Sequence, residues 1–205
     1  MPGRWLRERR KDHYYRMAKR RGLRSRAAYK LMQIQKKYHL ISPGDVVVDL
    51  GAAPGGWLQV ARDIVGGTGF TLGVDIKEIR PLGWENVKTL QLDINDEDAA
   101  VKILEALPRE ADVLLSDVAP SLSGVWELDH ARQIDLARKS LEIASKVLRP
   151  GGHALIKVFQ GEFLEEFLKD VKTLFSRVRL VKPKASRPRS AEVYVVAMGF
   201  RGNPP

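Results

Sequence analysis

Residues 46–57 read Val-Val-Val-Asp-Leu-Gly-Ala-Ala-Pro-Gly-Gly-Trp, and this stretch decides the fold. Three β-branched residues and a Leu predict a short buried strand. A glycine-rich turn follows, and residues 58–64 read as the start of a helix. A strand that runs through glycines into a helix is typical of a nucleotide-binding α/β domain. Asp75 ends the next predicted strand, 70–75, where a carboxylate would meet the diol of a ribose.

The glycines of this turn do not have the spacing of a dinucleotide site. They are Gly51, Gly55 and Gly56. A pyrophosphate cradle needs G-x-G-x-x-G, and here Pro54 also removes one backbone donor while the bulky Trp57 follows directly. Asp49 would repel a phosphate but suits a cation. The turn therefore favours an adenosine ligand with positive charge, such as S-adenosylmethionine; the alternative is an ordinary strand–turn–helix without a ligand.

Apolar runs alternate with helical patterns along the rest of the chain. Further strands are expected at 70–75, 87–92, 112–116, 153–159, 178–181 and 192–198. Helices are expected at 25–38, at 96–107, between 129 and 150, and at 162–175. This alternation predicts one domain of α/β class, with a doubly wound, mostly parallel, seven-stranded sheet and helices on both faces. The last two strands have no helix between them, so they should be antiparallel.

Four local signals set the expected boundaries. Ser25 can cap the first helix, and the helix over 96–107 should have an acidic first turn. Trp126 is expected in a polar loop over 121–129. Residues 150–152, Pro-Gly-Gly, should end the long helix before the strand at 153–159.

Composition limits the class of protein. The 205 residues are 44% apolar and 29% charged, which is ordinary for a globular domain. The absence of Cys excludes disulfides, Cys–zinc sites and Cys nucleophiles, and the four His residues lack metal-ligand spacing. No apolar run is long enough to span a membrane, and the N-terminus is too charged for a signal peptide. We therefore expect a cytoplasmic enzyme, monomeric and without a bound metal or a membrane partner.

The positive charge is concentrated near the N-terminus. Residues 1–37 contain 14 Lys or Arg and two acids, whereas the remainder has a net charge of −2. Aromatic residues are interleaved with these bases: Trp5, Tyr14, Tyr15 and Tyr29. Basic and stacking side chains together favour single-stranded or looped RNA. We expect residues 1–24 to form a basic arm ahead of a domain over 25–205; a solvated tail is the alternative for its first residues.

Chemistry-bearing residues recur where the predicted strands end. Four of them are acids: Asp49, Asp75, Asp93 and Asp117. Ligands of an open α/β sheet bind outside the carboxyl ends of its strands, so these acids should share one edge. Lys157 lies inside an apolar strand, although lysine is seldom buried without a partner. Lys157 should therefore face the same cleft as Asp117, unless it only protects an edge strand.

Five stretches together resemble one family. They are Ser-Arg-Ala-Ala-Tyr-Lys-Leu at 25–31, Asp-Leu-Gly-Ala-Ala-Pro-Gly-Gly-Trp at 49–57, Ser-Asp-Val-Ala-Pro at 116–120, Leu-Ile-Lys-Val-Phe-Gln-Gly at 155–161, and Ser-Arg-Pro-Arg-Ser-Ala-Glu-Val-Tyr at 186–194. The sequence resembles the FtsJ/RrmJ (RlmE) family of S-adenosylmethionine-dependent RNA ribose 2′-O-methyltransferases. The resemblance implies the Rossmann-like methyltransferase fold.

The resemblance also implies residue roles. The Lys–Asp–Lys–Glu tetrad of the family falls on Lys30, Asp117, Lys157 and Glu192. By the same resemblance, Gly55, Trp57, Asp75, Asp93 and Asp117 belong to the site of S-adenosylmethionine. We expect the complete cofactor site to include also Asp49, Gly51, Pro54, Gly56, Ile76 and Ile94. Residues 118–121, Val-Ala-Pro-Ser, differ from the Met-Ala-Pro-Asn that is commoner in bacterial members, and this departure concerns substrate choice.

Several alternatives remain open at this point. Lys157 could act as a neutral base or stay charged and only orient the ribose hydroxyl. The RNA could be large-subunit ribosomal RNA, free or in a ribosomal particle, with a uridine as target, or a tRNA anticodon loop. A non-enzymatic RNA-binding assembly factor would keep the basic arm but has no use for Lys157. A nicotinamide oxidoreductase is disfavoured by the glycine spacing, and a 5-methylcytosine methyltransferase by the lack of Cys.

Overall fold

The structure of the protein is a computed structural model, and residues 12–202 of it are described. Its centre is one seven-stranded sheet in the order β3-β2-β1-β4-β5-β7-β6. The strands are β1 (Val46–Leu50), β2 (Phe70–Asp75), β3 (Val87–Gln91), β4 (Ala111–Ser116), β5 (Leu148–Phe159), β6 (Phe175–Val181) and β7 (Glu192–Phe200). The first five strands pair in parallel, while β7 runs antiparallel to both β5 and β6. The predicted sheet and its antiparallel closing pair are confirmed.

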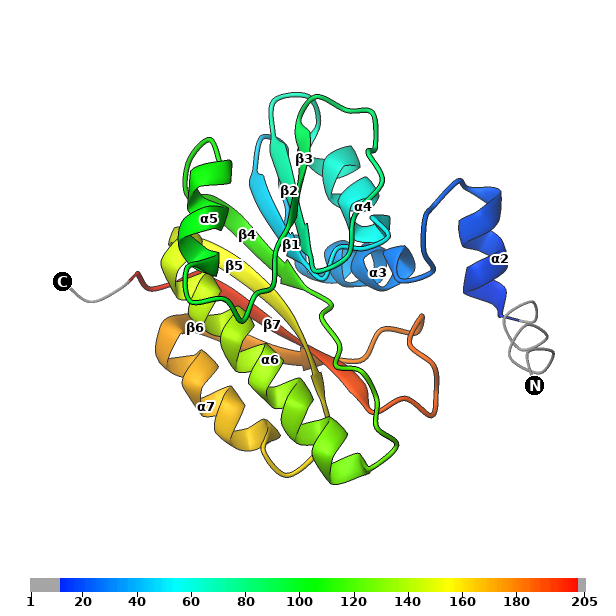
Figure 1. The fold of residues 1–205 in the computed structure, drawn as a ribbon, viewed down its shortest axis with the longest axis vertical. Coiled ribbons are helices and arrows are strands. Elements are labelled where there is room, and N and C mark those ends of the chain that lie inside the picture. Colours follow the sequence, from blue (N-terminus) through cyan, green and yellow to red (C-terminus); the bar gives the residue numbers. More distant parts are fainter. Residues whose placement is uncertain (1–11, 203–205) are drawn as a thin grey trace.

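Helices cover both faces of this sheet (Figure 1). They are α2 (His13–Arg20), α3 (Ala28–Tyr38), α4 (Gly56–Val65), α5 (Ala99–Ala106), α6 (Trp126–Val147) and α7 (Leu164–Leu174). The last three pack on one face, and α3 and α4 pack on the other. None of the helices within residues 12–202 is both long and apolar enough to cross a membrane.

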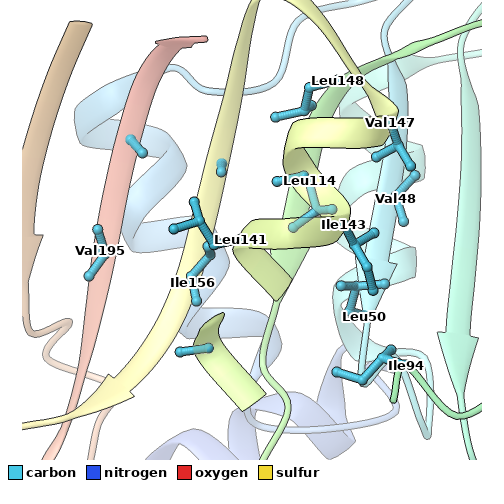
Figure 2. Close-up of a cluster of buried hydrophobic side chains, with 14 of the residues drawn as sticks. Val48, Leu50, Ile94, Leu114, Leu141, Ile143, Val147, Leu148, Ile156 and Val195 are labelled. Atoms are coloured by element: carbon cyan, nitrogen blue, oxygen red, sulfur yellow. The ribbon is translucent and has the colours of Figure 1, made fainter. Parts of the chain in front are cut away.

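The larger core lies between the sheet and the helices α5, α6 and α7. Figure 2 shows side chains of α6, such as Leu141 and Val147, facing those of the sheet, such as Leu50 and Ile156. Alternate residues of β1, such as Val48 and Leu50, enter this core, whereas Val47 enters the core on the opposite face. Because the parallel strands are covered on both sides, they read as continuous apolar runs. A polar side chain inside such a run, such as Asp49 or Lys157, therefore needs a specific explanation.

The N-terminal part of the described chain packs against the domain. Helix α2 contributes Ala18 to a small buried cluster with Tyr29 of α3 and Ala185. Asp12 caps α2 by accepting a hydrogen bond from the Tyr15 N–H, and it also forms an ion pair with Arg26. Residues 1–11 of the expected basic arm lie outside the described residues. The rest of the arm is thus helical and held by both apolar and charged contacts.

Three of the expected boundary signals are wrong. Ser25 does not cap α3 with its side chain, because Ala27 is the N-cap residue and the Ser25 carbonyl accepts the first turn's hydrogen bond. The acids of 96–98 precede α5 and do not form its first turn. Residues 150–152 lie inside β5, which begins at Leu148 and shifts its register against β4.

Trp126 is also placed differently from the prediction. It is the first residue of α6 and does not belong to the loop before it. The loop and the helix join here because Asp129, inside the first turn, accepts hydrogen bonds from the backbone N–H groups of Ser123 and Gly124. A carboxylate that satisfies donors ahead of the helix lets α6 begin at Trp126, four residues earlier than the end of the predicted loop at 129 would allow.

Candidate active site

A cleft of about 390 Å³ opens at the carboxyl edge of the sheet. It lies outside the ends of β1, β2, β3 and β4. Its walls include six of the predicted cofactor residues: Gly51, Asp75, Ile76, Asp93, Ile94 and Asp117. The parallel strands bring these residues together, as expected for an open α/β sheet.

The floor of the cleft depends on Gly51. This residue has a φ of +74°, and a Cβ built on it would lie 3.0 Å from both the backbone N and the Cα of Val118. The turn after β1 and the turn after β4 therefore touch through their backbones. A side chain at position 51 would push these two walls of the cleft apart.

Two acids are fixed by local hydrogen bonds at the mouth of the cleft. The Asp75 carboxylate accepts from the Ala53 N–H at 2.9 Å and from the Lys77 N–H at 2.8 Å. Asp93 accepts from the backbone and side-chain nitrogens of Asn95, at 2.9 and 3.0 Å. Each carboxylate oxygen has two lone pairs, so both acids keep acceptor capacity for a ligand.

Asp49 is the most unusual group near the cleft. Its side chain is only 1% exposed, and within residues 12–202 neither of its carboxylate oxygens has a hydrogen-bond partner. Burial, together with the negative charges of Asp117 and Asp75, raises the pKa of Asp49 well above its usual value. A buried acid without a partner costs free energy unless a ligand compensates it. The orphaned carboxylate fits a ligand that carries positive charge, such as S-adenosylmethionine.

The predicted tetrad forms one connected network beside the cleft. Lys157 Nζ donates to the Asp117 carbonyl at 2.6 Å and lies 3.2 Å from Asp117 Oδ1. The Tyr194 hydroxyl donates to the same Oδ1 at 2.7 Å and accepts from Lys30 Nζ at 3.2 Å. Lys30 also forms a 2.6 Å ion pair with Glu192. All four tetrad residues are thus joined, with Tyr194 as the link.

Four elements place these side chains. Lys157 on β5 pairs directly with Tyr194 on β7, and Glu192 begins β7 two residues earlier. Asp117 follows β4, the parallel neighbour of β5. Lys30 comes from α3, which packs across the same face of the sheet. The network therefore depends on strand register as well as on the position of α3.

Charge around Asp117 is balanced in favour of its ionised form. Burial alone would raise the pKa of Asp117, but the ammonium groups of Lys157 and Lys30 and the hydrogen bond from Tyr194 hold it below its usual value. Burial and the charges of Asp117 and Glu192 raise the pKa of Tyr194 well above its usual value. Tyr194 therefore stays protonated and acts as a donor.

Helix α6 supports the network from the opposite face. The buried Gln133 side chain donates to the Lys157 carbonyl at 3.1 Å and to the Val118 carbonyl at 3.2 Å. One amide thereby holds the end of β5 and the turn after β4 together. This contact restricts the positions of both Lys157 and Asp117.

Five of the predicted cofactor residues do not line the cleft: Asp49, Pro54, Gly55, Gly56 and Trp57. Trp57 is buried, its ring lies 5.8 Å from that of Tyr194, and its Nε1 donates to the Ala27 carbonyl at 2.8 Å. A Cβ on Gly56 would lie 2.2 Å from Ser25 Oγ. This glycine is therefore explained by close packing of the segment before α3. The cofactor role of these five residues stays a prediction.

Two residues of the site were not singled out from the sequence. Tyr194 gave no signal, because tyrosine is common in strands. Arg24 donates to three carbonyls, those of Pro54, Arg80 and Pro81, and so joins the glycine turn to the loop after β2. One arginine among many in a basic segment carries no distinguishing pattern.

Comparison with known proteins identifies the family. The model of the family described as FtsJ-like methyltransferase matches residues 23–200. The chain is 55% identical over 186 residues to the ribosomal RNA large subunit methyltransferase E of Methanothrix thermoacetophila, covering 91% of this chain and 71% of that protein. It is 47% identical over 199 residues to the protein of the same name from Methanococcus maripaludis strain C5, covering 97% and 77%.

A solved structure agrees with this relationship. The crystal structure of a protein from Plasmodium falciparum, named as a ribosomal RNA methyltransferase, has a TM-score of 0.78 and 28% identity, and the match covers 88% of this chain and 100% of that one. The seven-stranded sheet is thus the methyltransferase fold that the resemblance implied. The chain belongs to the family of FtsJ-like methyltransferases, enzymes whose methyl donor is S-adenosylmethionine.

Proposed function

We propose that this enzyme methylates the ribose 2′-hydroxyl of a uridine in large-subunit ribosomal RNA. The observation that carries the proposal is the network of Lys157, Asp117, Tyr194, Lys30 and Glu192 beside the cleft. A ribose hydroxyl is a weak nucleophile, so the enzyme must align it and assist the loss of its proton. The two relatives from Methanothrix thermoacetophila and Methanococcus maripaludis, both named as ribosomal RNA large subunit methyltransferase E, support the choice of RNA.

The cofactor-site residues have distinct roles in this proposal. Asp75 would accept hydrogen bonds from the ribose diol of the cofactor, and Asp93, which lines the same cleft, would offer a further acceptor. Asp49 provides negative charge under the glycine turn for the cationic part of the ligand. When bound, S-adenosylmethionine supplies a methyl group already activated by its sulfonium. Gly51 keeps the two turns close, so that the cleft opens directly beside Asp117.

Lys157 acts on the hydroxyl. Asp117 engages two of the three donor directions of its ammonium group, through its carbonyl and its carboxylate. The remaining direction is available to the ribose oxygen. Lys157 either accepts the proton in its neutral form or orients the hydroxyl in its charged form. In both cases, Asp117 and the Gln133 contact hold the Nζ group in place.

Lys30 and Glu192 position the acceptor nucleotide from the other side of Tyr194. A small cavity beside them is lined by Arg26 and Arg187 and lies near the tetrad. A second cavity between α2 and the glycine turn is lined by Lys19, Arg24, Arg26 and Arg187. These cations can neutralise consecutive phosphates, and the basic arm of residues 1–24 extends the same charge. All of these groups belong to one chain, so a monomer suffices.

Ribosomal RNA and tRNA from cells that lack the gene provide the test. Purified enzyme and labelled S-adenosylmethionine should label large-subunit ribosomal RNA, as free RNA or in subunits. Because a 2′-O-methyl group blocks the hydroxyl that attacks the neighbouring phosphate, the label should survive alkaline hydrolysis in a dinucleotide that begins with uridine. Label in the base would contradict the ribose hydroxyl as the acceptor. Label in tRNA would contradict ribosomal RNA as the substrate. If neither RNA were labelled, the proposal as a whole would be wrong.

A further inference from the structure

Four aromatic rings form a continuous stack at one end of the molecule. Phe159, Trp126, His130 and Phe163 have successive ring centroids 6.0, 5.7 and 5.5 Å apart, with interplanar angles of 20°, 16° and 7°. They come from the end of β5, the first turns of α6 and the segment before α7. We call these four rings the aromatic row. Near-parallel rings at these distances are offset stacks.

The row is held rigidly. The Phe163 N–H donates to Nε2 of the buried His130 at 3.2 Å. Burial lowers the pKa of His130, so the ring stays neutral and Nε2 can accept. A Cβ on Gly161 would lie 2.6 Å from the His130 ring, so the chain passes directly against it. Asp129 fixes the loop before α6, and Trp126 is therefore presented on a defined backbone.

Although the row is rigid and His130 is buried, two of its rings are open to solvent. Trp126 is 46% exposed and Phe163 38%, while the neighbouring Leu122 and Val125 are 70% and 55% exposed. A single exposed apolar residue needs no explanation, but a contiguous exposed group with ordered aromatic rings indicates a binding surface. Flat aromatic faces are suited to a flat partner, whereas aliphatic side chains alone would not favour a flat partner over other apolar groups.

The row starts at the catalytic network. Phe159 pairs with Glu192 in the β5–β7 ladder and lies two residues after Lys157. On α6, His130 is one turn before Gln133, whose side chain holds the Lys157 carbonyl. A nucleotide chain with its reactive ribose at Lys157 would therefore have neighbouring residues within reach of Phe159 and Trp126.

The charge near the row favours the base end of a nucleotide. Glu127 is exposed beside Trp126, and the carboxylate of Glu162 acts on His130. These acids repel phosphates, which Arg24, Arg26 and Arg187 can take in the two basic cavities, one of them beside Lys30 and Glu192. The surface thus separates a basic path for the backbone from an aromatic path for bases.

We propose that the aromatic row, through Trp126, stacks an unpaired base next to the methylated nucleotide. The inference rests on the proposed RNA substrate and deepens it, because it requires single-stranded or splayed RNA at the site. It assigns the row to RNA bases and not to a protein partner. Trp126 is a positioning residue, since it does not contact the reacting atoms.

The test compares Trp126→Ala with Trp126→Phe, which keeps an aromatic face. The probe is a labelled 12-residue oligouridylate, with an abasic ribose-phosphate oligomer of equal length as its partner. Trp126→Ala should weaken binding of the oligouridylate by roughly 5- to 100-fold, as expected for the loss of one base stack. Trp126→Phe should restore most of it, and neither substitution should change binding of the abasic oligomer. Trp84→Ala is the matched control, because Trp84 stacks on Arg62 away from the tetrad.

Kinetics separate this inference from the proposed function. With ribosomal RNA, Trp126→Ala should raise KM by a similar factor and leave kcat near wild type. Failure of the wild-type enzyme to label ribosomal RNA would contradict the function and leave the oligomer binding test standing. Unchanged oligouridylate affinity in Trp126→Ala, or an equal reduction with the abasic oligomer, would overturn the stacking role; the first result would assign the row to a protein partner.

Discussion

Two buried aspartates on neighbouring strands differ in what surrounds them. Asp112, at the amino edge of the sheet, accepts from the Val46 N–H at 2.7 Å, from Arg149 Nε at 2.5 Å and from Arg109 at 2.7 Å. Burial alone would raise the pKa of Asp112, but the hydrogen bonds from Arg109, Val46 and Arg149 hold it below its usual value. Asp49, on β1, has no such partner within the described chain, and its pKa is raised.

The difference indicates that the amino edge of the sheet contributes to stability, whereas the carboxyl edge is left open for a ligand. At the amino edge, β1 and β4 are joined to each other by a carboxylate that accepts from a backbone N–H and from two arginines, so its charge is already compensated within the chain. At the carboxyl edge, the same two strands carry Asp49 and lead to Asp117 beside an open cleft. An unpartnered charge lowers the stability of the protein without its ligand and provides a site that only a ligand completes.

The strongest way to test the functional edge is to remove Lys157. Lys157→Ala should lower the single-turnover rate of methyl transfer by about 10²- to 10⁴-fold, the usual contribution of a positioned acid or base. Cofactor and RNA affinities should stay near wild type, because the group acts mainly in the transition state. Rates near wild type in this variant would remove Lys157 from catalysis.

Lys157→Arg sharpens the same result. An arginine keeps the positive charge but cannot give up its proton at working pH. If Lys157 acts as a base, the arginine variant should be almost as slow as the alanine variant. Substantial rescue by arginine would assign a purely orienting role to the ammonium group.

Removal of Asp112 tests the structural edge. Asp112→Ala should lower the free energy of unfolding by about 2–3 kcal/mol, because it breaks charge-assisted hydrogen bonds and leaves the Val46 N–H unpaired. Urea denaturation measures this change, and kcat of the folded enzyme should be unaltered. A reduced kcat without a loss of stability would mean that Asp112, at the amino edge, also influences the site at the carboxyl edge.

Substitution of Asp75 tests whether the cleft at the carboxyl edge binds the cofactor. Asp75→Ala should weaken S-adenosylmethionine binding by roughly 1.5–3 kcal/mol in calorimetry, the worth of hydrogen bonds to a charged group. Part of this change reflects the freed Ala53 N–H, so Asp75→Asn serves as the control that keeps an acceptor oxygen. Affinity unchanged in both variants would exclude Asp75 from the site.

Asp49→Asn should have a smaller effect, and, unlike Asp112→Ala, it should raise the stability of the protein without cofactor. Because the pKa of Asp49 is raised in the folded state, its ionisation costs stability as the pH rises from the ordinary value of 3.8 through the raised one. Without cofactor, the variant should therefore gain in melting temperature over wild type as the pH increases to neutrality. It should also bind the cationic cofactor more weakly. Parallel melting curves at all pH values would show that Asp49 has a partner after all.

The smallest expected effect concerns the basic arm. Deletion of residues 1–11 removes five bases and one acid and leaves the packed helix α2 intact. The slope of log RNA affinity against log salt should decrease by about 0.7 for each phosphate that the shortened protein no longer neutralises, while cofactor affinity stays constant. An unchanged slope would assign RNA binding to the domain alone.

The sequence predicted the carboxyl edge well because strand ends are local features. Periodicity located the strands, parallel pairing brought Asp75, Asp93 and Asp117 to one edge, and Lys157 stood out as a charge in an apolar run. The order of the strands then made Lys157 a neighbour of Asp117. These inferences need only the period of the pattern and the direction of the strands.

Long-range packing could not be predicted in the same way. Trp57 follows the glycine turn, and only the position of α3 directs its ring into the core. Gly56 is small because Ser25 approaches it, a contact between segments 31 residues apart in the sequence. The Pro-Gly-Gly of 150–152 lies inside β5 because β4 pairs with β5 on both sides of it, at Leu148 and at His153, with a register shift between. In each case a distant segment decided the outcome.

The link through Tyr194 has a consequence for how the two ligands communicate. Asp117 lines the cleft that we propose for the cofactor, its carboxylate accepts a hydrogen bond from the Tyr194 hydroxyl, and that hydroxyl accepts one from Lys30. RNA that draws Lys30 toward a phosphate or a ribose would change the charge that Asp117 experiences, and with it the free energy of the bound cofactor. By thermodynamic linkage, the factor by which RNA changes cofactor affinity equals the factor by which cofactor changes RNA affinity. The Tyr194 hydroxyl would then couple the binding of RNA to the binding of the cofactor.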